Sequence, residues 1–124
     1  MKRLSFLSWL VLFPLALWLL GCKQEVQTDA TQPLQESFQA AEPEVKQSIE
    51  SVTASLKAGN YAEATRALAP VVTQRPLTDA QKQAVGLALQ QVNQAMAANA
   101  ALDTKEMYEL RAKMFQAVHR GPRF

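Results

Sequence analysis

The sequence predicts an all-α fold in which four antiparallel amphipathic helices occupy residues 43–119. From Pro43 onward, apolar residues recur at intervals of three and four, and no alternation of apolar and polar residues is sustained. Ala, Gln, Leu, Glu and Lys, which favour helices, fill the same stretch. Short connections between the helices would place consecutive ones antiparallel.

The first two helices are expected at residues 43–58 and 61–73. Pro43 suits a first helical position, and Gly59 can adopt the left-handed conformation that ends a helix. The inward stripe of the first helix is Val45, Ile49, Val52 and Leu56. That of the second is Tyr61, Ala64, Leu68 and Val71 or Val72. Pro70 lies inside the second helix and is expected to bend it, because proline lacks a backbone N–H.

The third and fourth helices are expected at residues 79–101 and from about 103 to 119. Thr78 is a candidate N-cap of the third helix, and Asp103 followed by Glu106 has the pattern of a capping box at the start of the fourth. The inward stripe of the third helix is Val85, Ala88, Leu89, Val92, Ala95 and Met96. That of the fourth is Met107, Leu110, Met114, Phe115 and Val118.

Residues 1–21 have the composition of a secretory signal. Lys2 and Arg3 precede an uncharged apolar stretch from Leu4 to Leu20, and the small residue Gly21 follows. As a helix, the apolar stretch would reach roughly 26 Å at about 1.5 Å per residue, just short of a hydrocarbon core. Length alone therefore leaves two interpretations, a cleaved signal and an uncleaved anchor.

Leu19-Leu20-Gly21-Cys22 resembles the lipobox of bacterial lipoproteins, although Leu20 is a little larger than usual for that pattern. The resemblance, which covers residues 1–22, implies cleavage between Gly21 and Cys22 and attachment of a diacylglyceryl group to the Cys22 sulfur. Two lipid chains suffice for stable anchoring. In that family an Asp after the cysteine retains the protein in the inner membrane, so Lys23 favours the outer membrane, facing the periplasm.

Residues 22–42 are predicted to form a flexible linker after the lipidated N-terminus. Polar residues dominate this segment, apolar ones are isolated and Pro33 interrupts it. Such a composition buries too little surface to offset the entropy of ordering. A short helical turn ahead of Pro43, or packing of Phe38 onto the domain, is the alternative.

The segment Gly59-Asn60-Tyr61-Ala62-Glu63-Ala64 resembles the G-[DN]-Y-x-x-A junction of a tetratricopeptide repeat. In that family the Gly turns the chain, the Tyr wedges between two helices and the Ala lets them approach. Ser48 replaces the family's Trp, Val52 stands where Gly or Ala is usual, and no second junction follows. The resemblance covers about residues 43–76 and implies one helical hairpin, whereas a peptide groove needs several repeats.

Neither composition nor motifs indicate catalysis, a metal or a nucleic acid. Without Lys2 and Arg3 the 13 basic residues become 11, equal to the 11 acidic ones, and a neutral chain is unlike a nucleic-acid binder. The sequence has no hydrolase elbow, phosphate-binding glycine loop or spaced pair of histidines. The sole histidine, His119, is expected to be a cation at a helix C-terminus. We therefore expect no enzymatic activity, no cofactor and no metal.

Basic residues crowd the end of the sequence: Arg111, Lys113, Arg120 and Arg123. One interpretation is a cationic tail, residues 120–124, that contacts anionic headgroups or polymers of the cell envelope. The other, which we favour, is a solvated helix face with a frayed basic end.

These observations favour a lipid-anchored, periplasm-facing helical interaction or scaffolding module without catalytic activity. It would contact membrane lipid through acylated Cys22, and a partner protein or a second copy through its helices, because so small a core leaves apolar surface to cover. The alternative is a structural envelope lipoprotein that forms helical oligomers and associates non-covalently with the cell wall. Small major lipoproteins of that kind end in a lysine joined to peptidoglycan, whereas this chain ends in Arg123-Phe124.

Overall fold

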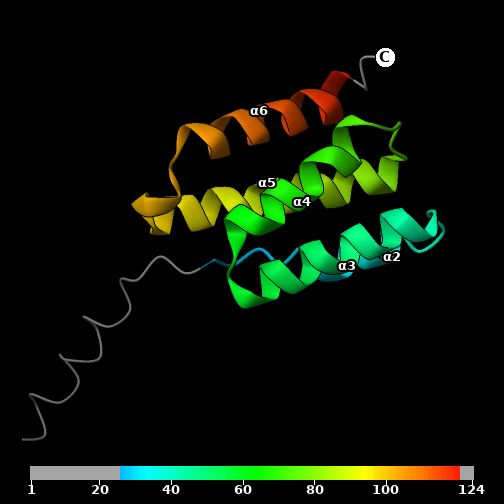
Figure 1. The fold of residues 1–124 in the computed structure, drawn as a ribbon, viewed down its shortest axis with the longest axis horizontal. Coiled ribbons are helices and arrows are strands. Elements are labelled where there is room, and N and C mark those ends of the chain that lie inside the picture. The colour runs from blue at the N-terminus through cyan, green and yellow to red at the C-terminus, as the bar shows by residue number, and fades with distance from the viewer. Residues whose placement is uncertain (1–25, 121–124) are drawn as a thin grey trace, which may run out of the picture.

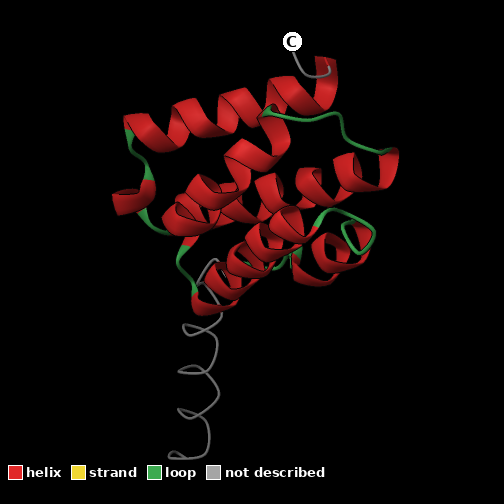
Figure 2. Ribbon diagram, turned by 45° about the vertical axis from the view of Figure 1, so that its right-hand side comes forward, coloured by secondary structure: helices red, strands yellow, loops and turns green. Residues whose placement is uncertain are grey.

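The computed structural model describes residues 26–120, and every regular element in that range is a helix. Figure 2 shows the helices joined by loops, with no strand in the described part of the chain. The elements are α2 (Thr31–Ser37), α3 (Pro43–Ala58), α4 (Tyr61–Thr73), α5 (Asp79–Ala98), a 3-10 helix η2 (Ala100–Leu102) and α6 (Lys105–Arg120). The predicted all-α class is confirmed. The predicted number of four helices is close but not exact: α3 to α6 lie in the predicted helical region, and α2 adds a fifth α-helix within the predicted linker.

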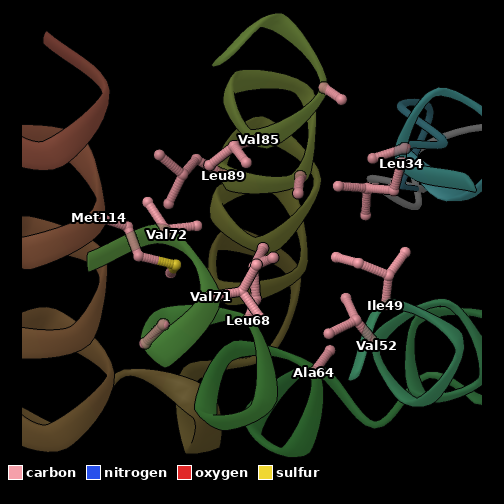
Figure 3. Packing of buried hydrophobic residues seen from close by; sticks show 14 of the residues in the cluster. Leu34, Ile49, Val52, Ala64, Leu68, Val71, Val72, Val85, Leu89 and Met114 are labelled. Carbon is pink, nitrogen blue, oxygen red and sulfur yellow. The ribbon is translucent and has the colours of Figure 1, made fainter. Parts of the chain in front are cut away.

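The helices pack around α4, with α3 on one side and α6 on the other (Figure 1). α5 contacts α2, α4 and α6, and the short α2 also packs against α3. Side chains from all five α-helices meet in one core. Figure 3 shows this convergence for Leu34 of α2, Ile49 of α3, Leu68 of α4, Val85 of α5 and Met114 of α6.

α3 and α4 begin and end where the sequence predicts, and their predicted stripes are buried except for the half-buried Tyr61. Gly59 ends α3 in the left-handed conformation, with φ of 79°. Its N–H donates to the Leu56 carbonyl at 3.2 Å, and the N–H of Asn60 donates to the Ser55 carbonyl at 2.8 Å. Both bonds satisfy carbonyl groups that a helix end leaves free. The chain reverses here, and α3 packs against α4 as a hairpin.

α5 has the expected cap and buries its predicted stripe, but it ends earlier than predicted. Thr78 Oγ1 accepts a hydrogen bond from Gln81 N at 3.1 Å, and Gln81 Oε1 accepts one from Thr78 N at 3.0 Å. The helix stops at Ala98 rather than at residue 101. Asn99 leaves helical geometry, and its Oδ1 accepts a hydrogen bond from Ala101 N at 3.1 Å to start η2.

The predicted capping box of Asp103 and Glu106 at the start of α6 is wrong. Asp103 still belongs to the end of η2, where its N–H donates to the Ala100 carbonyl at 3.1 Å. The cap is instead Thr104, whose Oγ1 accepts a hydrogen bond from Met107 N at 3.2 Å.

Phe115, predicted to point inward from α6, is 55% exposed. The inward face of α6 is centred on Met107, Met114 and Ala117, all of which are buried. Phe115 lies about 100° around the helix from Met114, because an α-helix has about 3.6 residues per turn. Its ring therefore falls outside the core.

The predicted flexible linker over residues 22–42 is wrong for the part that contains α2. Ala30, Leu34 and Phe38 recur every four residues, so one helical face carries all three. Ala30 and Leu34 are 0% exposed and Phe38 is 2% exposed. This face packs against α3 and α5, so the helical domain begins near Ala30 rather than at residue 43.

The predicted signal peptide, residues 1–21, and the predicted lipid attachment site, Cys22, lie outside the described residues. The same holds for residues 121–124 of the predicted basic tail, and Arg120 is the last residue of α6. Between residues 26 and 120, no helix is both long enough and apolar enough to cross a membrane.

Candidate functional site

A groove of about 270 Å³ runs between α5 and α6 and is the strongest candidate for a functional site. Its walls are Leu89, Asn93, Tyr108, Arg111, Ala112, Phe115 and Gln116. The groove exists because α6 directs its apolar face mainly at α4 and packs less extensively against α5. We call it the α5–α6 groove.

Two exposed aromatic rings on α6 border the α5–α6 groove. Tyr108 is 65% exposed and Phe115 is 55% exposed. They are seven residues apart in the sequence, which places them on the same face of the helix, two turns from each other. The Phe115 ring stacks on the His119 ring with centroids 4.0 Å apart, and His119 Nδ1 lies 2.9 Å from the Phe115 carbonyl oxygen. This stacking holds the Phe115 ring at the rim of the groove.

Arg111 carries the only formal charge among the residues that line the groove. Its Nη1 donates a hydrogen bond to Asn93 Oδ1 of α5. Its Nε is buried and has no hydrogen-bond partner among residues 26–120. A guanidinium offers five N–H donors in a planar fork that matches a carboxylate. The sequence grouped Arg111 with the basic residues at the end of the chain. In the structure it lines the α5–α6 groove.

A surface ion pair joins α6 to α4. Arg66 of α4 donates from Nε to Glu106 Oε1 at 2.6 Å and from Nη2 to Glu106 Oε2 at 3.1 Å. Arg66 Nη1 also donates to Glu63 Oε1 at 3.1 Å. The hydrogen bonds from Arg66 hold the pKa of Glu106 below its ordinary value, and Glu106 raises the pKa of Arg66. Because both partners are exposed, the pair contributes less to the position of α6 than the buried contacts of Met107 and Met114 do.

The residues predicted for the tetratricopeptide-like junction lie at the α3–α4 turn and do not line the groove. Gly59 and Asn60 make the cap described above. Tyr61 packs against both apolar clusters of the core, and Ala64 is 2% exposed. These four residues shape the hairpin, and Gly21 and Cys22, predicted for cleavage and lipidation, lie outside the described residues.

A second, smaller hollow of about 200 Å³ lies between α2 and α3. It is lined by Gln35, Phe38, Gln39, Lys46, Ile49 and Glu50. Both hollows lack the residues of a metal site: residues 26–120 contain no group of three or more His, Cys, Asp and Glu side chains that could hold a metal ion.

The patterns considered above did not predict the α5–α6 groove, although the sequence carries one signal of it. Tyr108, Ala112 and Phe115 are spaced by four and three residues, as an apolar stripe would be, yet they lie on a different face from Met107 and Met114. A helix with two apolar stripes has one face for its own core and another for a further contact.

Comparison of the chain with protein-family models, with curated proteins and with solved structures found no match. The class of this protein is therefore described from its fold and its groove alone. Residues 26–120 form a small all-α domain in which a helix hairpin and three further α-helices enclose an apolar core and leave an apolar groove lined by a single cation.

Proposed function

We propose that this protein is a lipid-anchored, periplasm-facing interaction module that binds an acidic amphipathic helix of a partner protein in the α5–α6 groove. Lipid on Cys22 holds the module at the outer membrane, as the lipobox resemblance implies. The helical domain has no catalytic role and supplies the binding surface. The α3–α4 hairpin, with its tetratricopeptide-like junction, is the scaffold that supports this surface.

The single observation that carries the proposal is the combination of exposed aromatic rings and a half-buried cation in one groove. Tyr108 and Phe115 leave apolar area in water that a partner would cover. An amphipathic helix is the natural occupant of such a groove, because its apolar face can lie along two neighbouring helices. A carboxylate on that helix would meet the Arg111 guanidinium, which has no acidic partner among the groove residues.

A photo-crosslinking residue in place of Ala112, inside the groove, tests the binding site in the native envelope. We expect an adduct with another protein whose crosslinked peptide is acidic and amphipathic. Arg111→Glu reverses the charge in the groove and should abolish the adduct. Lys113→Glu makes the same charge change at an exposed residue outside the groove and should leave the adduct in place. Equal loss in both variants, or no adduct from position 112, would overturn the proposed groove function.

The same crosslinking experiment can instead show that the protein binds a second copy of itself. That result would favour the alternative function, a structural envelope lipoprotein that forms oligomers. Glu109 and Lys113 lie one turn apart on α6 and are both exposed, so two antiparallel copies of α6 would bring them into reciprocal pairs. An adduct between two copies of this chain would favour that function over a partner helix. Recovery of the protein with sedimented cell wall after detergent extraction would support it further.

The lipid anchor is tested separately by Cys22→Ser. Without the sulfur there is no site for a thioether-linked lipid, so the protein should leave the membrane fraction or accumulate as an unprocessed precursor. The mass of the mature N-terminus measures the acylation of the unaltered protein directly. A Cys22→Ser protein that stays membrane-bound with its N-terminus correctly cleaved would refute lipid anchoring.

A further inference from the structure

The segment that follows the proposed lipid site is tied to the helical domain at both of its ends. We define the N-terminal strap as residues 27–38. At its start, Gln94 Oε1 of α5 accepts hydrogen bonds from Gln27 N at 3.1 Å and from Thr28 N at 2.9 Å. Next along, Gln91 Oε1 accepts one from Ala30 N at 2.9 Å. The strap thus begins on α5 rather than in solvent.

The far end of the N-terminal strap is held by a polar contact and by apolar burial. Gln81 Nε2 of α5 donates a hydrogen bond to the Ser37 carbonyl at 3.2 Å. Leu34 and Phe38, between α3 and α5, are among the largest fully buried side chains of the domain. A segment that buries such side chains is part of the fold and does not act as a spacer.

The strap shortens the tether between lipid and domain. From Cys22 to Gln27 the chain spans at most about 18 Å, because each extended residue adds about 3.3–3.6 Å. A free linker from Cys22 to residue 42 would instead reach about 70 Å by the same rule. α5 alone is about 30 Å long at 1.5 Å per residue. The tether is therefore shorter than the domain that it holds.

The strap begins at one particular end of the helix bundle. Gln94 lies near the C-terminal end of α5, and η2 follows that end directly. Hydrogen bonds from Thr31 hold the pKa of Asp29 below its ordinary value, and the positive charge of Lys57, near the end of α3, also lowers it. Figure 1 shows the α3–α4 turn, η2 and the start of the strap at the same end, and the α4–α5 connection at the opposite end. We call the first of these the strap end.

We propose that the N-terminal strap orients the domain on the lipid surface, with the strap end facing the headgroups and the α4–α5 connection pointing away. This inference rests on the proposed lipidation of Cys22. The exposed side chains of the strap end include the small, uncharged residues 97–101, the cations Lys57 and Lys105 and the anions Asp29 and Asp103. These four charges sum to zero, so they do not repel a headgroup layer. The α5–α6 groove then runs along the side of the domain, where a partner reaches it without displacing lipid.

Energy transfer from protein to lipid tests the orientation. The full-length acylated protein is placed in phosphatidylethanolamine and phosphatidylglycerol vesicles that carry an acceptor dye on a small fraction of headgroups. A donor dye is attached through Ala101→Cys at the strap end or through Gln74→Cys at the α4–α5 connection, both of which are exposed. Cys22 does not compete for the dye because its sulfur carries the lipid. We expect higher transfer from position 101 than from position 74.

Two variants test whether the strap causes the orientation. Gln91→Ala combined with Gln94→Ala removes the acceptors that hold the strap, and should reduce the difference in transfer. Insertion of a flexible Gly/Ser segment between Gln24 and Glu25 lengthens the tether without changing the domain, and should reduce the difference even if the double variant fails to fold. Gln90→Ala, an exposed neighbour on α5, should leave the difference intact.

The outcomes of this experiment distinguish a failure of the proposed orientation from a failure of the proposed lipid anchor. Acylated, vesicle-bound protein with equal transfer from both positions would overturn the orientation and leave the lipid anchor standing. A difference that survives the inserted segment would also overturn it, because the short tether would not be its cause. Protein that lacks the acyl mass and does not float with vesicles would refute the anchor and the orientation together.

Discussion

Arg66 of α4 contacts both carboxylate oxygens of Glu106 of α6, with donor–acceptor distances of 2.6 and 3.1 Å. The contact joins residues far apart in the sequence and lies on the protein surface. Because the folded state lowers the pKa of Glu106, the ionised carboxylate favours folding. This stabilisation is present above the pKa of Glu106 in the unfolded chain and is lost as the pH falls through its lower pKa in the folded state.

We therefore expect Glu106→Gln to lower the urea midpoint at neutral pH and to have no effect at a pH below the folded-state pKa of Glu106. Because both partners are exposed, solvent screening keeps the effect small. Glu109→Gln is the control, since Glu109 makes only a 3.8 Å contact with the exposed Lys105. A Glu106→Gln effect that does not change with pH would contradict the role of the ion pair.

Phe38→Ala should destabilise the domain by about 3–5 kcal/mol, because a buried phenylalanine loses its transfer energy and leaves a cavity. Phe115→Ala removes the same ring from a site that is 55% exposed, and should change the free energy of unfolding by less than about 0.5 kcal/mol. Urea denaturation of the chain without residues 1–22 measures both. Equal, small effects would mean that Phe38 belongs to a linker after all.

The described residues include two glycines, Gly59 and Gly86, and replacing each with alanine should change the stability of the protein in opposite directions. Gly59 has a left-handed backbone, which strains any residue with a Cβ, so Gly59→Ala should destabilise the protein by about 1 kcal/mol. Gly86 lies inside α5, and a Cβ there would meet nothing within 4 Å beyond the adjoining backbone of its own helix, so Gly86→Ala should stabilise the protein by up to about 1 kcal/mol. Thermal unfolding of the two variants measures the direction of each stability change. Changes in the same direction would contradict the roles assigned to the backbone at these two glycines.

Thr78→Ala should destabilise the domain by about 1 kcal/mol, because the N–H of Gln81 loses its acceptor at the start of α5. Thr78→Ser keeps an Oγ in the same position and should restore most of the loss. Chemical denaturation of the two variants provides the comparison. If serine were no better than alanine, the hydroxyl would not be the stabilising group.

Local sequence patterns predicted much of the fold and little of the candidate site. Pro43, Gly59 and Thr78 mark helix ends through backbone conformation or short-range hydrogen bonds, so each can be recognised from a few neighbouring residues. The α5–α6 groove depends instead on which face α6 presents to α4. The face that packs against α4 is decided by residues from separate helices. It therefore cannot be predicted from the spacing of residues along α6 alone.

The amino-acid sequence by itself determined the all-α class, the bounds of α3 and α4 and the left-handed turn at Gly59, because these follow from interactions within a few residues. Only the tertiary structure decided that Leu34 and Phe38 are buried, that Phe115 is exposed and that Arg111 lies in a groove. A short segment with few apolar residues becomes ordered when other helices supply the surface that it packs against. That surface forms only when the whole domain is assembled.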